Sequence, residues 1–185
     1  MVTIALPKRD SSSSYVGLLF FMATATMLFA GTISALLIRR ASSDWTSIFF
    51  PPMLLVNTAV ILVSSLTLEA ARFGLKGKNV FAYRSWMTVT MLLGIVFLVG
   101  QVLAWKELTA HGIFVPSNPH ASFFYLLTGM HALHLLGGII LLMVASVRAW
   151  RSSNVLEETK ILTLSRMYWH FLDVLWIYLV VVLFS

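Results

Sequence analysis

Five long hydrophobic stretches, separated by short polar segments, dominate the pattern along the chain. They cover approximately residues 15–38, 51–71, 85–105, 122–147 and 167–184. A helix needs about 20 apolar residues to cross the roughly 30 Å hydrocarbon core of a bilayer, and each stretch is about that long or longer. The pattern therefore predicts an all-α integral membrane protein, a single membrane domain over residues 1–185 built as a bundle of five transmembrane helices.

The segments that flank these stretches carry signals for helix ends. The pair Arg39-Arg40 ends the first stretch, and the second begins at Pro51-Pro52. Residues 154–164 place apolar residues among charged ones, which predicts a helical extension of the last span with Asn154 as its N-cap. The first stretch is too long for a signal-peptide core and follows the polar run 10–14 instead of a basic flank, so it is predicted to be retained.

The composition agrees with this interpretation and excludes a soluble domain. Hydrophobic residues make up 59% of the 185 residues and charged residues 11%, whereas soluble domains average about 45–50% and about 25%. Cysteine is absent from the sequence. This excludes disulfides, iron–sulfur clusters, thiolate zinc or copper sites, and thioether-linked haem.

The basic residues are divided unequally between the two sides of the predicted bundle. Of the 13 Lys and Arg residues, ten fall on one side and three on the other. The larger set is Lys8, Arg9, Arg72, Lys76, Lys78, Arg84, Arg148, Arg151, Lys160 and Arg166, and the smaller set is Arg39, Arg40 and Lys106. Because cytoplasmic loops are enriched in Lys and Arg, this predicts a cytoplasmic N-terminus and a C-terminus outside. The net charge of +6 then needs no nucleic-acid partner.

Polar and ionisable side chains at membrane depth are the candidate functional residues, because such groups are costly there and usually face the bundle interior. The fourth stretch holds His131 and His134, and the fifth holds His170 and Asp173, each pair three residues apart and therefore on one helix face. The second stretch adds Asn57 and Glu69.

Two interpretations of the histidines are open: metal or haem ligation, and a buried hydrogen-bond network that holds the fourth helix to the fifth. A bis-histidine haem needs one histidine from each of two helices at matched depth. His131 is near the outer face and His170 near the inner face, which favours the structural network. A proton relay through Glu69, Asp173 and the histidines is also considered, but the first and third spans contain no acid at depth. A small transporter is a further hypothesis, motivated by Glu69 and the buried polar groups. Arg148 and Arg151 either are topogenic charges or bind a lipid phosphate.

Three motifs resemble those of subunit III of haem–copper terminal oxidases. Residues 122–138 contain a stretch similar to that family's TGxHxxHxxxG signature, and residues 168–176 resemble its YWHFxDxxW motif. Residues 57–65 resemble its NTxxLLxSS stretch, and Gln101 with Trp105 partly matches a further pattern. The chain is similar to the five-helix bacterial form over residues from about 15 to the end.

The resemblance implies a non-redox, non-catalytic subunit of a proton-pumping aa3-type cytochrome c oxidase in the bacterial cytoplasmic (inner) membrane. Haem and copper are then held by partner subunits, and this chain packs directly on subunit I, alongside subunit II and small subunits. It implies bound phospholipid, with Arg148 at the family's lipid-contacting arginine, and support for proton uptake during reduction of O₂ to water. A quinol oxidase subunit III and a di-haem electron carrier are the alternatives, and membership of a respiratory supercomplex is left open.

Two positions depart from the family pattern. Ala25 stands where the family often has a glutamate in a SEVxFFxG stretch, and Ala104 stands where a glutamate commonly follows the family glutamine. The first replacement removes a buried carboxylate on which a proton-antenna role would depend.

Overall fold

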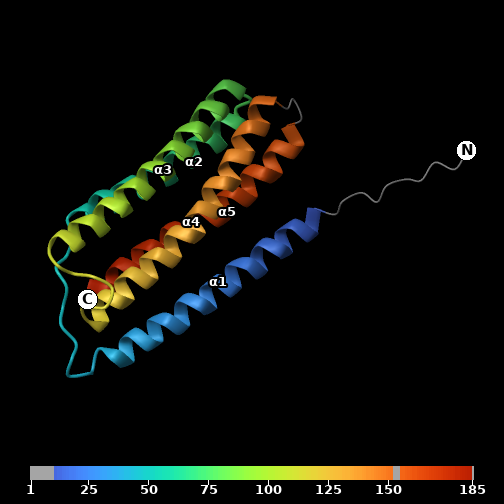
Figure 1. Cartoon of the computed structure of the whole chain (residues 1–185). Coiled ribbons are helices and arrows are strands. Elements are labelled where there is room, and N and C mark those ends of the chain that lie inside the picture. The colour runs from blue at the N-terminus through green and yellow to red at the C-terminus, as the bar shows by residue number, and fades with distance from the viewer. Residues whose placement is uncertain (1–10, 152–154, 185) are drawn as a thin grey trace, which may run out of the picture.

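Five long helices make up the described part of the chain. The computed structural model describes residues 11–151 and 155–184, and no strand occurs in them. The helices are α1 (Ser11–Arg39), α2 (Met53–Lys76), α3 (Val80–Ala110), α4 (Pro119–Arg151) and α5 (Val155–Phe184). Consecutive helices run in opposite directions (Figure 1). All five are long and apolar enough to cross a membrane, which confirms the predicted all-α fold with five membrane-spanning helices.

The helices continue beyond the hydrophobic stretches that predicted them. The largest difference is in α5, which begins at Val155 instead of near residue 167. The predicted helical extension of the last span is therefore present, although its proposed cap, Asn154, lies outside the described residues. Span length follows the thickness of the hydrocarbon, whereas a helix continues until its backbone meets a turn or a cap.

The two ends of the bundle differ in charge. The Trp45 end carries residues 40–52 and 111–118 and the last residues of α5, and the Lys78 end carries the connection between α2 and α3. Arg39, Arg40 and Lys106 lie toward the Trp45 end. The basic residues toward the Lys78 end are Arg72, Lys76, Lys78, Arg84, Arg148, Arg151, Lys160 and Arg166. The side of the membrane that each end faces stays a prediction.

Helices α2 and α3 form a tight antiparallel hairpin. The connection turns through Lys78, whose φ of 56° is in the left-handed region. Asn79 caps α3 by accepting a hydrogen bond from the backbone N–H of Ala82 at 3.0 Å. A Cβ at Gly74 would lie 2.9 Å from the backbone nitrogen of Tyr83. The two backbones therefore approach closely next to the turn because the residue at 74 has no side chain.

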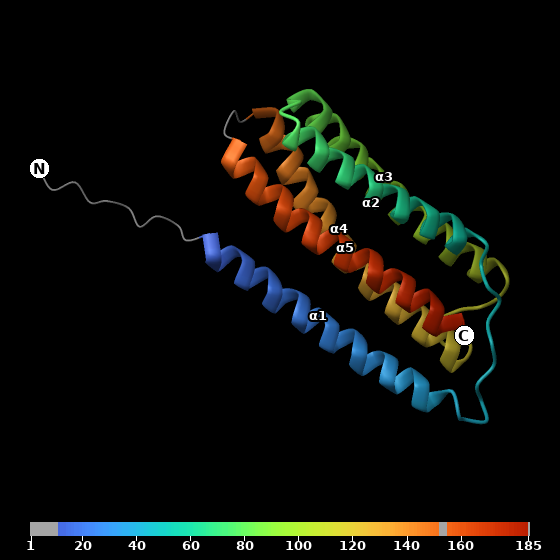
Figure 2. The ribbon, with the colours of Figure 1, turned by 180° about the vertical axis from the view of Figure 1, so that it is seen from behind.

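Helix α1 lies beside α4 and α5, on the side of the bundle away from α2 and α3 (Figures 1 and 2). Its contact face is an apolar row of buried residues, Ala25, Phe29, Ile33 and Leu36. The opposite face is exposed, with Phe20, Met27 and Ile38 each 70% or more accessible. This helix therefore packs through small and apolar side chains, whereas the other four helices share an interior that also contains polar residues.

Candidate functional site

The polar residues predicted as one network occupy three separate places. Glu69, His170 and Asp173 lie between α2 and α5. Asn57 and His131 are fully buried farther toward the Trp45 end. His134 faces α1.

The Glu69 network consists of Glu69, Arg72, Arg166, His170, Ser65 and Asp173. Glu69 Oε1 accepts a hydrogen bond from Arg166 Nε at 2.7 Å and lies 3.0 Å from His170 Nε2. Its other oxygen accepts from Arg72 Nη1 at 3.2 Å. A second Arg166 nitrogen also forms an ion pair with Glu69. One carboxylate therefore faces two guanidinium groups and an imidazole.

His170 links the carboxylate of Glu69 to that of Asp173. Its Nδ1 lies 2.7 Å from the Ser65 hydroxyl and 3.6 Å from Asp173 Oδ2. Asp173 is 5% exposed, and neither of its oxygens has a hydrogen bond within the described protein. The local geometry follows from helical spacing, because Arg166, His170 and Asp173 recur every three or four residues and so share the face of α5 that meets α2.

The Asn57 group consists of Asn57, Gln101 and His131, from α2, α3 and α4. All three are at most 1% exposed, and none carries a formal charge when the imidazole is neutral. The Asn57 Nδ2, both Gln101 amide atoms and both His131 ring nitrogens have no hydrogen-bond partner within the described protein. His131 packs against the rings of Phe97 and Trp176, at centroid distances of 5.9 and 5.1 Å.

His134 lies at the interface with α1. Its ring is 5.9 Å from that of Phe21 and 5.5 Å from that of Phe29, and its Nδ1 is 2.8 Å from the Met130 carbonyl of its own helix. Ala25 is buried on α1, one turn from each of these two phenylalanines. Position 25, where the resemblance leads one to expect an acid, therefore faces an apolar and aromatic surface around His134.

The expected hydrogen bonds of the histidines between α4 and α5 are replaced by others. The His170 side chain bonds to α2. Between α4 and α5, the Tyr168 hydroxyl donates to the His134 carbonyl at 2.9 Å, and His120 Nε2 bonds to the Leu183 carbonyl at 2.9 Å. Further bonds between α2 and α5 run from Trp169 Nε1 to Ser64 Oγ at 2.9 Å and from Trp176 Nε1 to Thr58 Oγ1 at 3.1 Å. The polar residues therefore hold α5 chiefly to α2.

Ligation of a metal or haem would need nitrogens free to converge. His170 has both ring nitrogens within hydrogen-bond distance of Ser65 and Glu69, and His131 belongs to a different group. Within residues 11–151 and 155–184, no cluster of three or more His, Asp or Glu residues is arranged to hold a metal ion.

Two structurally important residues were not selected from the sequence as site residues. His120 Nδ1 accepts a hydrogen bond from the Ile48 backbone N–H at 3.1 Å, and its Nε2 donates to the Leu183 carbonyl at 2.9 Å. Trp45 stacks on its ring at 4.8 Å. The sequence signal was weak, because His120 follows a proline in an apparent loop. Arg166 was counted as a topogenic charge, although its place one turn before His170 puts both on one face.

Arg148 and Arg151 are exposed near the end of α4, at the Lys78 end, and neither forms an ion pair or hydrogen bond with another described residue. Arg84, by contrast, donates to the Ala149 carbonyl at 2.7 Å and lies over the Trp150 ring. Both candidate lipid-binding residues are therefore accessible to an external anion.

Ala104, the second departure from the family pattern, is fully buried.

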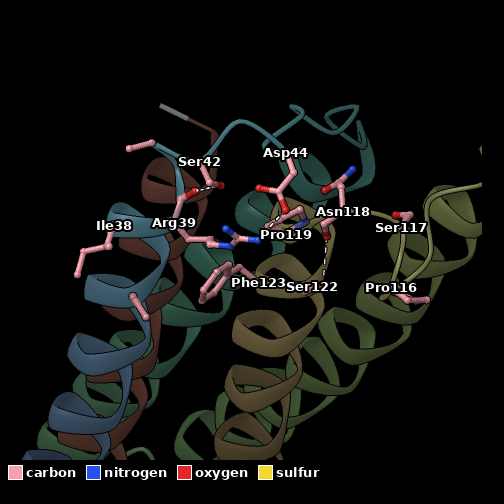
Figure 3. A pocket seen from close by; sticks show the side chains of 12 residues that line it. Ile38, Arg39, Ser42, Asp44, Pro116, Ser117, Asn118, Pro119, Ser122 and Phe123 are labelled. Carbon is pink, nitrogen blue, oxygen red and sulfur yellow. Dashed lines mark hydrogen bonds and ion pairs between the residues drawn. The ribbon is translucent and has the colours of Figure 1, made fainter.

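A cavity of about 1030 Å³ opens at the Trp45 end between the last turn of α1 and the start of α4 (Figure 3). Arg39 Nη2 and Asp44 Oδ2 form an ion pair at its rim at 2.6 Å. Hydrogen bonding from Ser42 and the nearby Arg39 guanidinium lower the pKa of Asp44 from its ordinary value. Ala35, Ile38 and Phe123 contribute an apolar wall.

The comparison with known proteins covers nearly the whole chain. Residues 13–185 match the family model described as cytochrome c oxidase subunit III. A probable cytochrome c oxidase subunit 3 of Mycobacterium tuberculosis is 32% identical over 178 residues, covering 91% of this chain and 86% of the relative. Cytochrome c oxidase subunit 3 of Corynebacterium diphtheriae is 32% identical over 176 residues, with the same coverage. The cytochrome bo(3) ubiquinol oxidase subunit 3 of Pseudomonas aeruginosa is 32% identical over 179 residues, covering 91% and 83%.

Proposed function

Because the chain belongs to the cytochrome c oxidase subunit III family, we propose that it serves an aa3-type cytochrome c oxidase in a bacterial cytoplasmic membrane. The match over residues 13–185, together with five membrane-spanning helices, is the observation that carries this proposal. The family makes it a subunit of a haem–copper oxidase and a multi-pass membrane protein. We propose the electron donor, the membrane and the roles of this chain.

The proposed role is stabilisation of catalytic subunit I without redox chemistry in this chain, beside subunit II and small subunits. In support, the hydrogen bonds from His170 to Glu69 and from Trp169 to Ser64 join α2 to α5 inside the bundle, while large apolar residues such as Leu66, Leu133 and Val174 are more than 60% exposed. Such an outer surface suits lipid and apolar partner helices. His131, His134, His170, Asp173, Asn57 and Glu69 would then hold the bundle together.

Phospholipid binding at Arg148 and Arg151 is the second proposed role. Both guanidinium groups are exposed near the Lys78 end and lack partners among the described residues. Arg binds phosphate oxygens in bidentate fashion. Native mass spectrometry should detect fewer retained phospholipids in Arg148→Ala than in wild type. Equal retention would contradict the lipid role, and Arg39→Ala at the opposite end provides the matched control.

Support for proton uptake is the third proposed role, and it places the Lys78 end in the cytoplasm. The Glu69 side chain is 28% exposed and the His170 side chain 36% exposed, so titratable groups reach the surface near that end. Tags at the two termini, combined with protease protection, test the orientation. A cytoplasmic C-terminus would contradict the arrangement.

A quinol oxidase is the alternative assembly, because the Pseudomonas aeruginosa relative carries that name at similar identity. Purification through a tag on this chain, from native membranes, decides between the two. We expect co-purified subunits I and II, haem a absorption, and oxidation of reduced cytochrome c. Oxidation of a quinol but not of cytochrome c would support the alternative. A Soret band from the isolated chain would instead support a di-haem carrier and contradict both.

A further inference from the structure

Three buried amide and imidazole side chains in the bundle interior have polar atoms that no described protein group satisfies. They belong to the Asn57 group, and five of their nitrogen and oxygen atoms lack a hydrogen-bond partner in the described protein. Each of the three residues is at most 1% exposed. Buried polar atoms are nearly always hydrogen-bonded, to protein or to ordered water.

The three side chains lie at one level of the bundle. Two contacts show how α2 and α3 align along the bundle. The Thr67 and Thr90 hydroxyls form a 2.8 Å hydrogen bond, and Asn57 Oδ1 occupies the space where a Cβ at Gly100 would stand. Asn57 therefore lies beside the residue that precedes Gln101.

The same reasoning connects Gln101 to α4. Phe97 contacts His131, and Trp105 Nε1 donates to Thr128 Oγ1 at 3.1 Å. Gln101 lies one turn from Phe97 and one turn from Trp105 on the same face of α3. Its amide is therefore level with the segment from Thr128 to His131, which includes the imidazole.

We infer that Asn57, Gln101 and His131 form a binding site for ordered water inside the bundle. The chemistry of the three groups favours this ligand. The Asn57 Nδ2 and Gln101 Nε2 donate, the Gln101 Oε1 accepts, and a neutral imidazole offers one donor and one acceptor. Water satisfies both kinds of atom, and a buried water makes about three hydrogen bonds.

Other small ligands fit the site less well. The group contains no carboxylate for a cation, and the rings of Phe97 and Trp176 cover the imidazole. The competing arrangement is dry, with the three side chains rotated into direct hydrogen bonds with one another. The two arrangements can be told apart in a map of the protein, because only the hydrated one has density for a water molecule between the side chains.

The test is a cryo-EM map of the intact oxidase at a resolution that shows bound water. We expect density for at least one water within hydrogen-bond distance of two or more of the three side chains. Direct hydrogen bonds among the side chains, or apolar contact with no density between them, would overturn the inference. Either result decides the question from the wild-type protein alone.

A variant sharpens the test. Gln101→Met keeps the length of the side chain and removes both amide atoms, and it should abolish or displace the water density. Thr90→Val is the matched control, because Thr90 is equally buried on α3 but bonds to Thr67. This control should leave the density unchanged.

A second measurement is water-edited solid-state NMR of the oxidase with labelled histidine. Magnetisation should pass from water to the buried His131 ring in wild type and fall at least twofold in Gln101→Met. Failure to detect transfer to His131 in the wild type would contradict the inference.

Discussion

The Glu69 network and the Asn57 group begin on the same helix, about three turns apart, yet they bury polar atoms in different ways. Glu69 is charged, 28% exposed at the side chain, and surrounded by two guanidinium groups and an imidazole. Asn57 is uncharged and 1% exposed, and its Nδ2 has no partner among the described residues. Burying a charged group is costly unless an oppositely charged partner lies beside it. In the Glu69 network these partners are arginines near the Lys78 end, whose long side chains also reach solvent.

The comparison shows that the depth of a polar group in the bundle determines which partners can stabilise it. Near the Lys78 end, Arg72 and Arg166 can bring charge to Glu69 while their side chains stay 37% and 21% exposed. Deeper in the bundle, the buried polar residues described for the Asn57 group are two amides and an imidazole. The first region is therefore held by ion pairs, and the second by packing together with hydrogen bonds that neutral groups can make.

The largest expected effect is at Trp169 on α5, which packs against α2 between the two regions. Trp169 is fully buried, donates to Ser64, and fills the space left by Gly94 and Gly138. Trp169→Ala should lower the free energy of unfolding by about 3–5 kcal/mol, because it leaves a cavity and removes the hydrogen bond to the Ser64 hydroxyl. Reversible unfolding in mixed micelles measures this.

The matched control for Trp169 is Trp150→Ala. Trp150 is 52% exposed and contacts the Arg84 guanidinium, so its loss should have a much smaller effect. Equal effects for the two tryptophans would show that packing between the two regions does not hold α5 to α2.

The next effect is at Glu69. Glu69→Ala leaves Arg166 and His170 without their shared acceptor and should cost about 1.5–3 kcal/mol, the range for hydrogen bonds to charged groups. The double variant Glu69→Ala with Arg166→Leu should recover part of that loss, because the unpaired guanidinium is removed as well. Unfolding in mixed micelles again measures the change, with Glu107→Ala as the control.

Additive losses in the double variant would contradict the comparison, because they would mean that Glu69 and Arg166 stabilise the fold independently. The distances between Arg166 and Glu69 predict strong coupling instead.

Much of the fold could be predicted from the sequence, because hydrophobic length determines how many helices cross a bilayer. The start of α5 was harder, since residues 155–166 mix charged and apolar positions and carry no span-length signal. The charge division between the ends was also predictable, because it depends only on the order of spans and loops.

The candidate site was predicted as a set of residues but not as an arrangement. His131 and His134 are three positions apart and so about 60° apart around α4. That angle is enough to direct one ring to the interior and the other toward α1. Likewise, His170 could be placed on a polar face of α5, but periodicity does not say that α2 covers that face. Neighbour identity depends on packing of the whole bundle.

A smaller effect is expected at Gly100, where the Asn57 group is tightest. A Cβ there would overlap the Asn57 amide and lie 3.0 Å from Met53 Cε. Gly100→Ala should therefore cost about 1–3 kcal/mol through overpacking. Gly129→Ala on α4 is the control, since nothing lies within 4 Å of its Cβ position. It should be neutral or stabilising by about 0.5–1 kcal/mol, and equal losses at both positions would contradict the tight contact.

The smallest effect is expected at the Arg39–Asp44 pair, which contrasts with Glu69 because its side chains are 48% and 54% exposed. Water screens such a pair and competes for both partners, so Asp44→Asn should change stability very little. The lowered pKa of Asp44 gives the sign of its pH dependence. Its stabilisation is complete above the ordinary Asp pKa and is lost as the pH falls through the lowered value. Unfolding measured across that acidic range in wild type and Asp44→Asn should therefore converge at the lowest pH. A difference that grows on acidification would mean that the protonated carboxyl, not the ion pair, stabilises this end of the bundle.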